Sequence, residues 1–168
     1  MQSRLPIKWK IFRVVNFLHL LGVVFMLLLV LYSFITFSYN TSSTEILVLA
    51  LFITGGATLL ANCICNHHLL EKVYPDKQVS KSFSVFSIII LVLTCIILLF
   101  LTITLSTFFY ISYNNRSVSV TTLGKMILSV LLAIMITGFY TCIFQVVLRV
   151  TIRRNYKRII DNFLNIDT

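Results

Sequence analysis

Four long runs of apolar residues dominate the pattern of hydrophobic and polar positions along this chain. A helix needs about 20 apolar residues to cross a hydrocarbon core about 30 Å thick, and each run reaches that length. The third run is longer than a crossing requires, so we expect its helix to tilt or to protrude. The pattern predicts an all-α polytopic membrane protein, a four-transmembrane-helix bundle in one domain (residues 1–168), with spans at residues 12–37, 46–65, 83–113 and 126–150.

The composition of the chain agrees with a membrane location. Hydrophobic residues make up 58% of the 168 residues and charged residues only 11%, whereas a soluble domain carries about 25% charged residues. A net charge of +9 in a soluble protein would suggest nucleic acid as a partner, but here the cations lie beside the apolar runs. We therefore expect the lipid bilayer as the main partner, and no nucleic acid.

The lysines and arginines predict how the helices are oriented. Of these 14 residues, all except Arg116 and Lys125 lie at the start of the first run, between the second and third runs, or at and beyond the end of the fourth. Lysine and arginine near short loops are retained in the cytoplasm. We therefore expect cytoplasmic N- and C-termini. The small size and minimal loops favour the bacterial inner (plasma) membrane.

The C-terminal tail, residues 151–168, has the pattern of a basic amphipathic helix. Apolar residues recur on one helical face, and arginines and lysines flank them. Such a helix binds anionic lipid or lies in the groove of a protein partner, and lipid anchoring is the simpler interpretation. The apolar residues are Ile152, Tyr156, Ile159, Ile160 and Phe163, and the flanking cations are Arg153, Arg154, Lys157 and Arg158.

Small and hydroxyl residues recur at every fourth position in the second and fourth runs. Such rows form an inclined ridge on a helix, where small residues let two backbones approach and polar ones hydrogen-bond across. We therefore expect the second and fourth helices to form the tight centre of the bundle, with the third facing lipid. The alternative is that hydroxyl residues are simply common in membrane helices. This helix-packing ridge comprises Thr54, Thr58, Ser129, Ala133, Thr137 and Thr141.

Larger polar side chains continue both rows toward the basic ends of the helices, and the first helix brings two more to a similar depth. An unpaired polar group in hydrocarbon costs a few kcal/mol, so we expect these residues to hydrogen-bond one another. The Arg149 guanidinium must either reach water or find acceptors, and the side-chain oxygens of Asn16, Asn62 and Gln145 are the acceptors expected within the bundle. The sequence leaves open whether they form a binding pocket or only hold helices together. This candidate polar cluster comprises Asn16, His19, Asn62, Asn66, Gln145 and Arg149.

The stretch NCICNHHLLEKVYPDK, residues 62–77, concentrates cysteines and histidines. Cys63 and Cys65 are two residues apart, so on a helix they point about 200° from each other, and one face cannot present both. Cys63 and His67, four residues apart, could supply half of a zinc site. Cysteines packed in the bundle and histidines at its polar end are the simpler interpretation. We expect no metal and no cofactor here.

The remaining residues argue against several chemistries. Proton-coupled transport commonly uses a carboxylate inside the membrane, but all five acids lie in predicted loops, at helix ends or in the tail. The loops expected outside the cytoplasm contain no cysteine, which argues against disulfide exchange. No Ser/His/Asp set, carboxylate pair or phosphate-binding glycine loop is present, so we expect no enzyme and no catalytic residues. The acids are Glu45, Glu71, Asp76, Asp161 and Asp167.

The function predicted from these features is that of a small non-enzymatic accessory, assembly or scaffolding subunit in a membrane. It would associate with a protein partner or with further copies of itself. The alternative is a small oligomeric channel or transporter built around the candidate polar cluster. A membrane enzyme using metal or haem at Cys63 and His67 is a more distant third.

Overall fold

The computed structural model describes residues 6–37, 43–73, 79–114 and 122–164, and the prediction of an all-α protein is confirmed. Each helix contains a segment long and apolar enough to cross a membrane, which favours a multi-pass membrane protein. The predicted turns at 38–45 and 114–122 and the centre of the loop at 66–82 lie largely outside the described residues. The helices are α1 (Ile7–Phe37), α2 (Ser43–Glu71), α3 (Lys81–Asn114) and α4 (Thr122–Leu164).

All four helices exceed the predicted spans, and two of them continue well past their predicted ends. Helix α2 continues beyond residue 65 to Glu71, because Leu69 and Leu70 in its last turns are buried against the bundle. Helix α4 continues through the basic tail as one helix of 43 residues, about 65 Å long at 1.5 Å per residue. The apolar pattern ends where a helix leaves the membrane, but the helix itself need not end there. Neither stretch contains a glycine or proline, the residues that most disfavour a helix.

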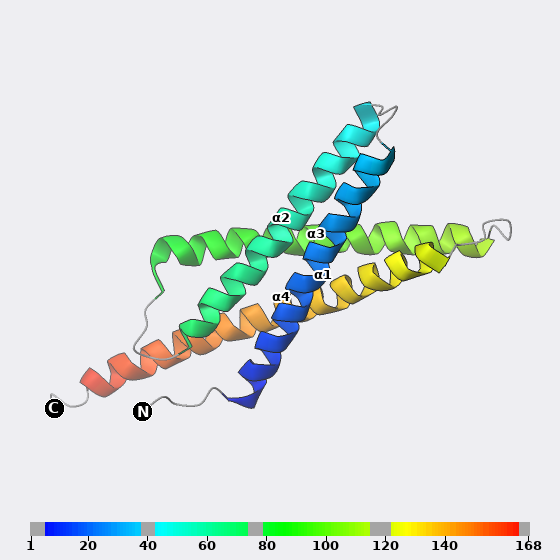
Figure 1. Ribbon diagram of the computed structural model, residues 1–168. Helices are drawn as coiled ribbons and strands as arrows, with labels where there is room; N and C mark the ends of the chain where they lie inside the picture. Colours follow the sequence, from blue (N-terminus) through cyan, green and yellow to red (C-terminus); the bar gives the residue numbers. More distant parts are fainter. Residues whose placement is uncertain (1–5, 38–42, 74–78, 115–121, 165–168) are drawn as a thin grey trace.

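The chain folds into two helical hairpins, α1 with α2 and α3 with α4, which cross each other (Figure 1). The starts of α1 and α3 and the ends of α2 and α4 make up what we call the basic half. The ends of α1 and α3 and the starts of α2 and α4 make up the hairpin half. Figure 1 shows the turn end of one hairpin well separated from the turn end of the other. The hairpins therefore diverge in the hairpin half.

The tight centre of the bundle differs from the one expected. Helix α1 packs most extensively against α2 and next against α4, whereas α2 and α4 share the smallest direct contact of the packed pairs. A larger share of the membrane-spanning segment is buried in α2 and α4 than in α1 and α3, as expected for the centre of the bundle, but these two helices do not pack tightly on each other. A row of small residues shows which face permits close approach, but it does not show which helix uses that face.

Two glycines are the closest points of approach between helices. A Cβ atom added at Gly56 would lie 2.5 Å from Cδ2 of Leu27 on α1. One added at Gly138 would lie 2.8 Å from Cδ2 of Leu98 on α3 and 3.0 Å from Cε1 of His19 on α1. Because glycine has no Cβ, it lets these side chains reach the backbones of α2 and α4.

Buried apolar side chains form two separate clusters along the bundle. The basic-half cluster includes the stacked rings of Phe12 and Phe144, whose centroids lie 5.7 Å apart. Helix α3 presents a broad exposed apolar face, as expected of a helix facing lipid, but much of α1 is exposed as well. The basic-half cluster comprises Trp9, Phe12, Leu69, Leu70, Val73 and Leu148, and the central cluster comprises Val23, Leu59, Leu98, Ile134 and Cys142.

Candidate functional site: a buried polar layer and a cleft beside it

Polar side chains from all four helices are buried in the basic half of the bundle. We call them, together with half-buried Arg149, the polar layer. Along α4 the layer extends from Thr141 to Arg149, which corresponds to about 12 Å of helix. All six residues of the candidate polar cluster lie in it. The buried members are Asn16, His19, Asn62, Asn66, Ser87, Thr94, Thr141 and Gln145.

Hydrogen bonds from α1 fix its register against α2 and α4. Asn66 Nδ2 donates to Asn16 Oδ1 at 3.1 Å, and Asn16 Nδ2 donates to the carbonyl oxygen of Cys63 at 3.0 Å. His19 Nδ1 lies 2.9 Å from Thr137 Oγ1. That hydroxyl already donates to the carbonyl oxygen of Ala133 at 2.7 Å. The His19 Nδ1–H is therefore the donor, which leaves Nε2 of the neutral ring as an acceptor.

Arg149 binds α3, and not the expected acceptors. Its guanidinium donates to Ser87 Oγ and to the carbonyl oxygen of Ser84 at 3.4 Å. The Ser87 hydroxyl hydrogen goes to the carbonyl oxygen of Phe83 at 2.8 Å, so Ser87 Oγ is free to accept. The expectation that Asn16, Asn62 and Gln145 accept from Arg149 is therefore wrong.

Sequence reasoning missed Ser84, Ser87 and Thr94 because α3 was assigned to lipid from its overall composition. The signal was present in the spacing. Ser84 and Ser87 are three residues apart and Thr94 follows two turns later, so all three share one helical face. In the structure Ser87 and Thr94 are fully buried on that face, while the rest of α3 is mostly exposed and apolar.

Several atoms of the polar layer have no hydrogen-bond partner within the described part of the chain. Both amide atoms of Asn62 and both of Gln145 are in this state, although the two side chains are fully buried. A buried polar atom left unpaired costs about 1–3 kcal/mol. The mutual hydrogen bonding expected of the cluster is therefore only partly made. The other atoms are His19 Nε2, Asn66 Oδ1, Thr94 Oγ1 and Arg149 Nε.

Most residues of the helix-packing ridge are less buried than those of the polar layer. Thr54, Ser129 and Ala133 are exposed, Thr58 and Thr137 are half-buried, and only Thr141 is buried. The hydroxyls of Thr54, Thr58 and Thr141 donate to carbonyl oxygens of their own helices. Thr137 hydrogen-bonds a side chain of another helix, His19. The hydroxyls of Thr54 and Thr58 therefore bond within α2.

A cleft of about 600 Å³ opens where the hairpins diverge, and all four helices line it. Its walls are apolar and include Val30, Leu51, Phe100 and Leu131. The central cluster separates the cleft from the polar layer, since Val23, Leu59 and Ile134 belong both to that cluster and to the cleft wall. The cleft and the polar layer are therefore two distinct features, one in each half of the bundle.

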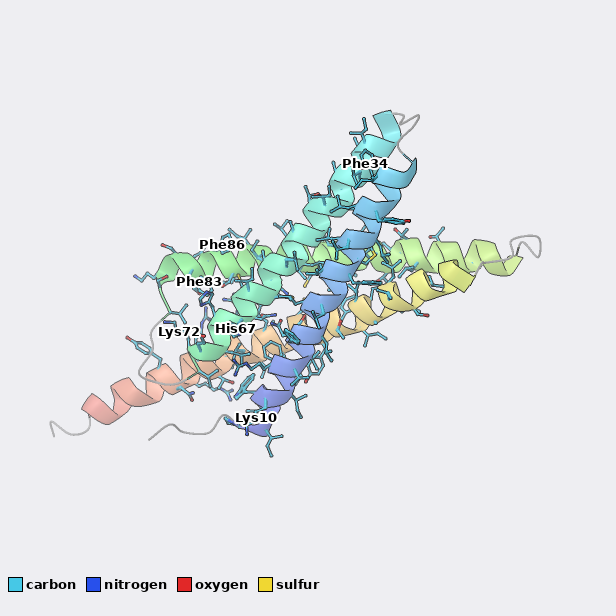
Figure 2. The ribbon with its side chains drawn as sticks, in the orientation of Figure 1. Lys10, Phe34, His67, Lys72, Phe83 and Phe86 are labelled. Carbon is cyan, nitrogen blue, oxygen red and sulfur yellow. The ribbon has the colours of Figure 1, made fainter. Side chains whose placement is uncertain are left out.

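The cysteine and histidine stretch is divided between interior and surface. Cys63 and Cys65 are buried, as is Cys142 on α4. His67 and His68 are exposed and lie 3.7 and 3.8 Å from the Glu71 carboxylate. Figure 2 shows His67 and Lys72 at this end of α2, beside the start of α3 with Phe83. Among the described residues, no three histidine, cysteine or acidic side chains gather as a metal site.

Comparison with known proteins adds no relative: no family model, no curated protein and no solved structure matches this chain.

Proposed function

We propose that the protein is a non-enzymatic accessory, assembly or scaffolding subunit that binds a transmembrane partner through the cleft in its hairpin half. The observation that carries the proposal is the cleft itself. The chain's own helices diverge there and leave an apolar recess lined by all four of them. Membrane helices associate by close packing of side chains, so such a recess suits the side chains of another helix.

The polar groups in the cleft wall favour an apolar occupant. The three hydroxyl residues in the wall, Thr54, Thr58 and Thr104, donate to the carbonyl oxygens of Ala50, Thr54 and Phe100 in their own helices. None of these hydroxyls needs a donor or acceptor from the occupant. A ligand with a polar headgroup inside the cleft would lose its hydration and gain no hydrogen bond in return.

The size of the cleft indicates how a partner would fit. A helix 10–12 Å across that rises 5.4 Å per turn occupies roughly 400–600 Å³ per turn. The cleft, at about 600 Å³, therefore holds the side chains of about one turn and not the length of a helix. We propose that a partner helix, from another protein or from a second copy, lies over the cleft and inserts its large apolar side chains.

The proposed setting is a bilayer, with the basic half toward the cytoplasm of a bacterial inner membrane. Arg153, Arg154 and Lys157 are exposed on α4, where they can contact anionic lipid headgroups. Asn155 Nδ2 donates to the carbonyl oxygen of Val73 at 3.1 Å. This bond holds the start of the tail against the end of α2 and fixes its direction.

A second candidate is the oligomeric channel or transporter, and the observation that favours it is the polar layer. A polar path in one chain would have to pass the central cluster, where Val23, Leu59, Leu98 and Ile134 are buried and apolar. A channel would therefore need a path between several copies.

Photo-crosslinking in native membranes tests the proposed function. Benzoylphenylalanine is placed at Phe100, which lines the cleft, or at Phe86, an exposed residue of α3 outside the cleft wall that Figure 2 labels. The proposal predicts a discrete protein adduct from position 100 and none from position 86. Adducts to lipid alone at position 100 would contradict it, because lipid would then be the occupant. A homodimer adduct would identify the partner as a second copy.

A further inference from the structure

We propose that the polar layer binds a cluster of water molecules trapped between the two apolar clusters. This inference is independent of the proposed function, because it concerns the basic half and not the cleft. It starts from Asn62 on α2 and Gln145 on α4. Both side chains are fully buried, and neither amide group has a partner among the described residues. His19 Nε2 and Thr94 Oγ1 add unpaired atoms from α1 and α3.

The chemistry of these atoms identifies the occupant. The amide nitrogens of Asn62 and Gln145 donate, whereas their amide oxygens and His19 Nε2 accept. A halide or phosphate would pair only with the donors, and a metal cation only with the acceptors. Water does both and makes about three hydrogen bonds when buried. The mixture of unpaired donors and acceptors therefore fits water.

The charge of the layer points in the same direction. Arg149 is the only formally charged member, and its partners on α3 are the neutral oxygens of Ser84 and Ser87. A cation among these residues would be repelled by the guanidinium with no carboxylate beside it to compensate. An anion would face the amide oxygens of Asn62 and Gln145. Water is compatible with both groups.

Apolar side chains close the layer at both ends. Toward the basic end lie Phe12, Leu69 and Leu148 of the basic-half cluster, and toward the hairpin half lies the central cluster. These two clusters shield the layer from both ends of the bundle. Because α2 and α4 share the smallest direct contact of the packed helix pairs, bridging water would join these two helices through Asn62 and Gln145.

Proton-detected solid-state NMR of the full chain in bilayers tests the inference. The readout is the cross-peak between the water proton frequency and the side-chain amide protons. Trapped water predicts cross-peaks to both Asn62 and Gln145, although both are fully buried. Asn155, half-buried near the basic end of α4, is the positive control. Cross-peaks to Asn155 alone would show that the layer is dry and would overturn the proposal.

Two further measurements separate water from other occupants. Gln145→Met keeps the length of the side chain and removes its hydrogen bonds, so it should weaken the water cross-peak of Asn62. The matched variant Asn155→Leu should leave that cross-peak unchanged. Replacing chloride by gluconate, or sodium by potassium, should leave both amide shifts in place. A change in either amide shift on ion exchange would show that an ion occupies the layer. An unchanged Asn62 cross-peak in Gln145→Met would show that water does not bridge Asn62 and Gln145.

Discussion

At the scale of single residues, the polar layer is held by side chains that make one specific bond and keep another atom unpaired. Asn66 donates to Asn16 but leaves its own Oδ1 unpaired, and His19 donates from Nδ1 but leaves Nε2 unpaired. Some of its bonds join helices directly, and the proposed water molecules would pair with the remaining atoms.

The contact between Arg149 and Ser87 can be measured as a coupling. Ser87→Ala removes the hydroxyl acceptor of a half-buried guanidinium, so it should lower the free energy of unfolding. Polar contacts between membrane helices are worth about 0.6 kcal/mol on average and up to about 1.7 kcal/mol. In an Arg149→Leu background, Ser87→Ala should cost less by about this amount. A double-mutant cycle on the unfolding free energy in detergent checks this.

The control for this cycle is Thr107→Ala, which removes an α3 hydroxyl that donates to Ile103 of its own helix. It should show no coupling to Arg149→Leu. Additive effects of Ser87→Ala and Arg149→Leu would mean that Arg149 is held in some other way.

At the scale of helices, glycines set how closely the hairpins pack, and two neighbouring glycines allow a matched test. A Cβ at Gly56 would meet three atoms of the Leu27 side chain between 2.5 and 3.1 Å, whereas a Cβ at Gly55 would meet its nearest atom, Ile97 Cγ2, at 3.9 Å. Overpacking of a core costs about 1–3 kcal/mol, and alanine is about 1 kcal/mol better than glycine in a helix.

Gly56→Ala should therefore destabilise the protein, while Gly55→Ala should be neutral or stabilising. Thermal unfolding of the two variants in the same detergent gives the comparison. Equal melting temperatures for both variants would contradict the close packing of α1 on α2.

The sequence predicts the features that are determined within a single helix better than it predicts the pairing of helices. Hydropathy and length predict four helices, because each must satisfy its own backbone in an apolar setting. Four-residue spacing predicts that Asn62 and Gln145 lie at the basic end of their rows. Helix pairing depends on side chains far apart in sequence, such as Leu27 against Gly56. The local pattern therefore did not predict that α1, and not α4, packs most extensively on α2.

In the candidate site, too, some residues were predicted from the sequence and others were missed. Asn16 and His19 were predicted to lie with Asn62 and Asn66 because all four interrupt apolar runs near the basic ends. Ser87 was not predicted to belong to the site. A single hydroxyl in an apolar run can hydrogen-bond a carbonyl oxygen of its own helix, as Thr107 does. Only the position of Arg149 beside it makes Ser87 an acceptor.

At the scale of the whole molecule, the two halves of the bundle have different properties. The basic half holds the polar layer between two apolar clusters, and the hairpin half opens into the cleft. In the proposed orientation the polar layer lies toward the cytoplasm, and the cleft lies toward the opposite leaflet. A partner would therefore be bound in the outer part of the membrane, and the basic tail would lie on the inner surface.

Orientation is the central claim, because the proposed site for the partner, the position of the tail and the depth of the polar layer all depend on it. Single cysteines are introduced at Ser42, Gln78 or Ser119 in a chain whose native cysteines, Cys63, Cys65, Cys95 and Cys142, are replaced by alanine. A membrane-impermeant thiol reagent is then applied to intact cells and to inverted vesicles. The proposed orientation predicts labelling of positions 42 and 119 from outside and of position 78 only from the cytoplasmic face. Labelling of position 78 from outside would contradict it.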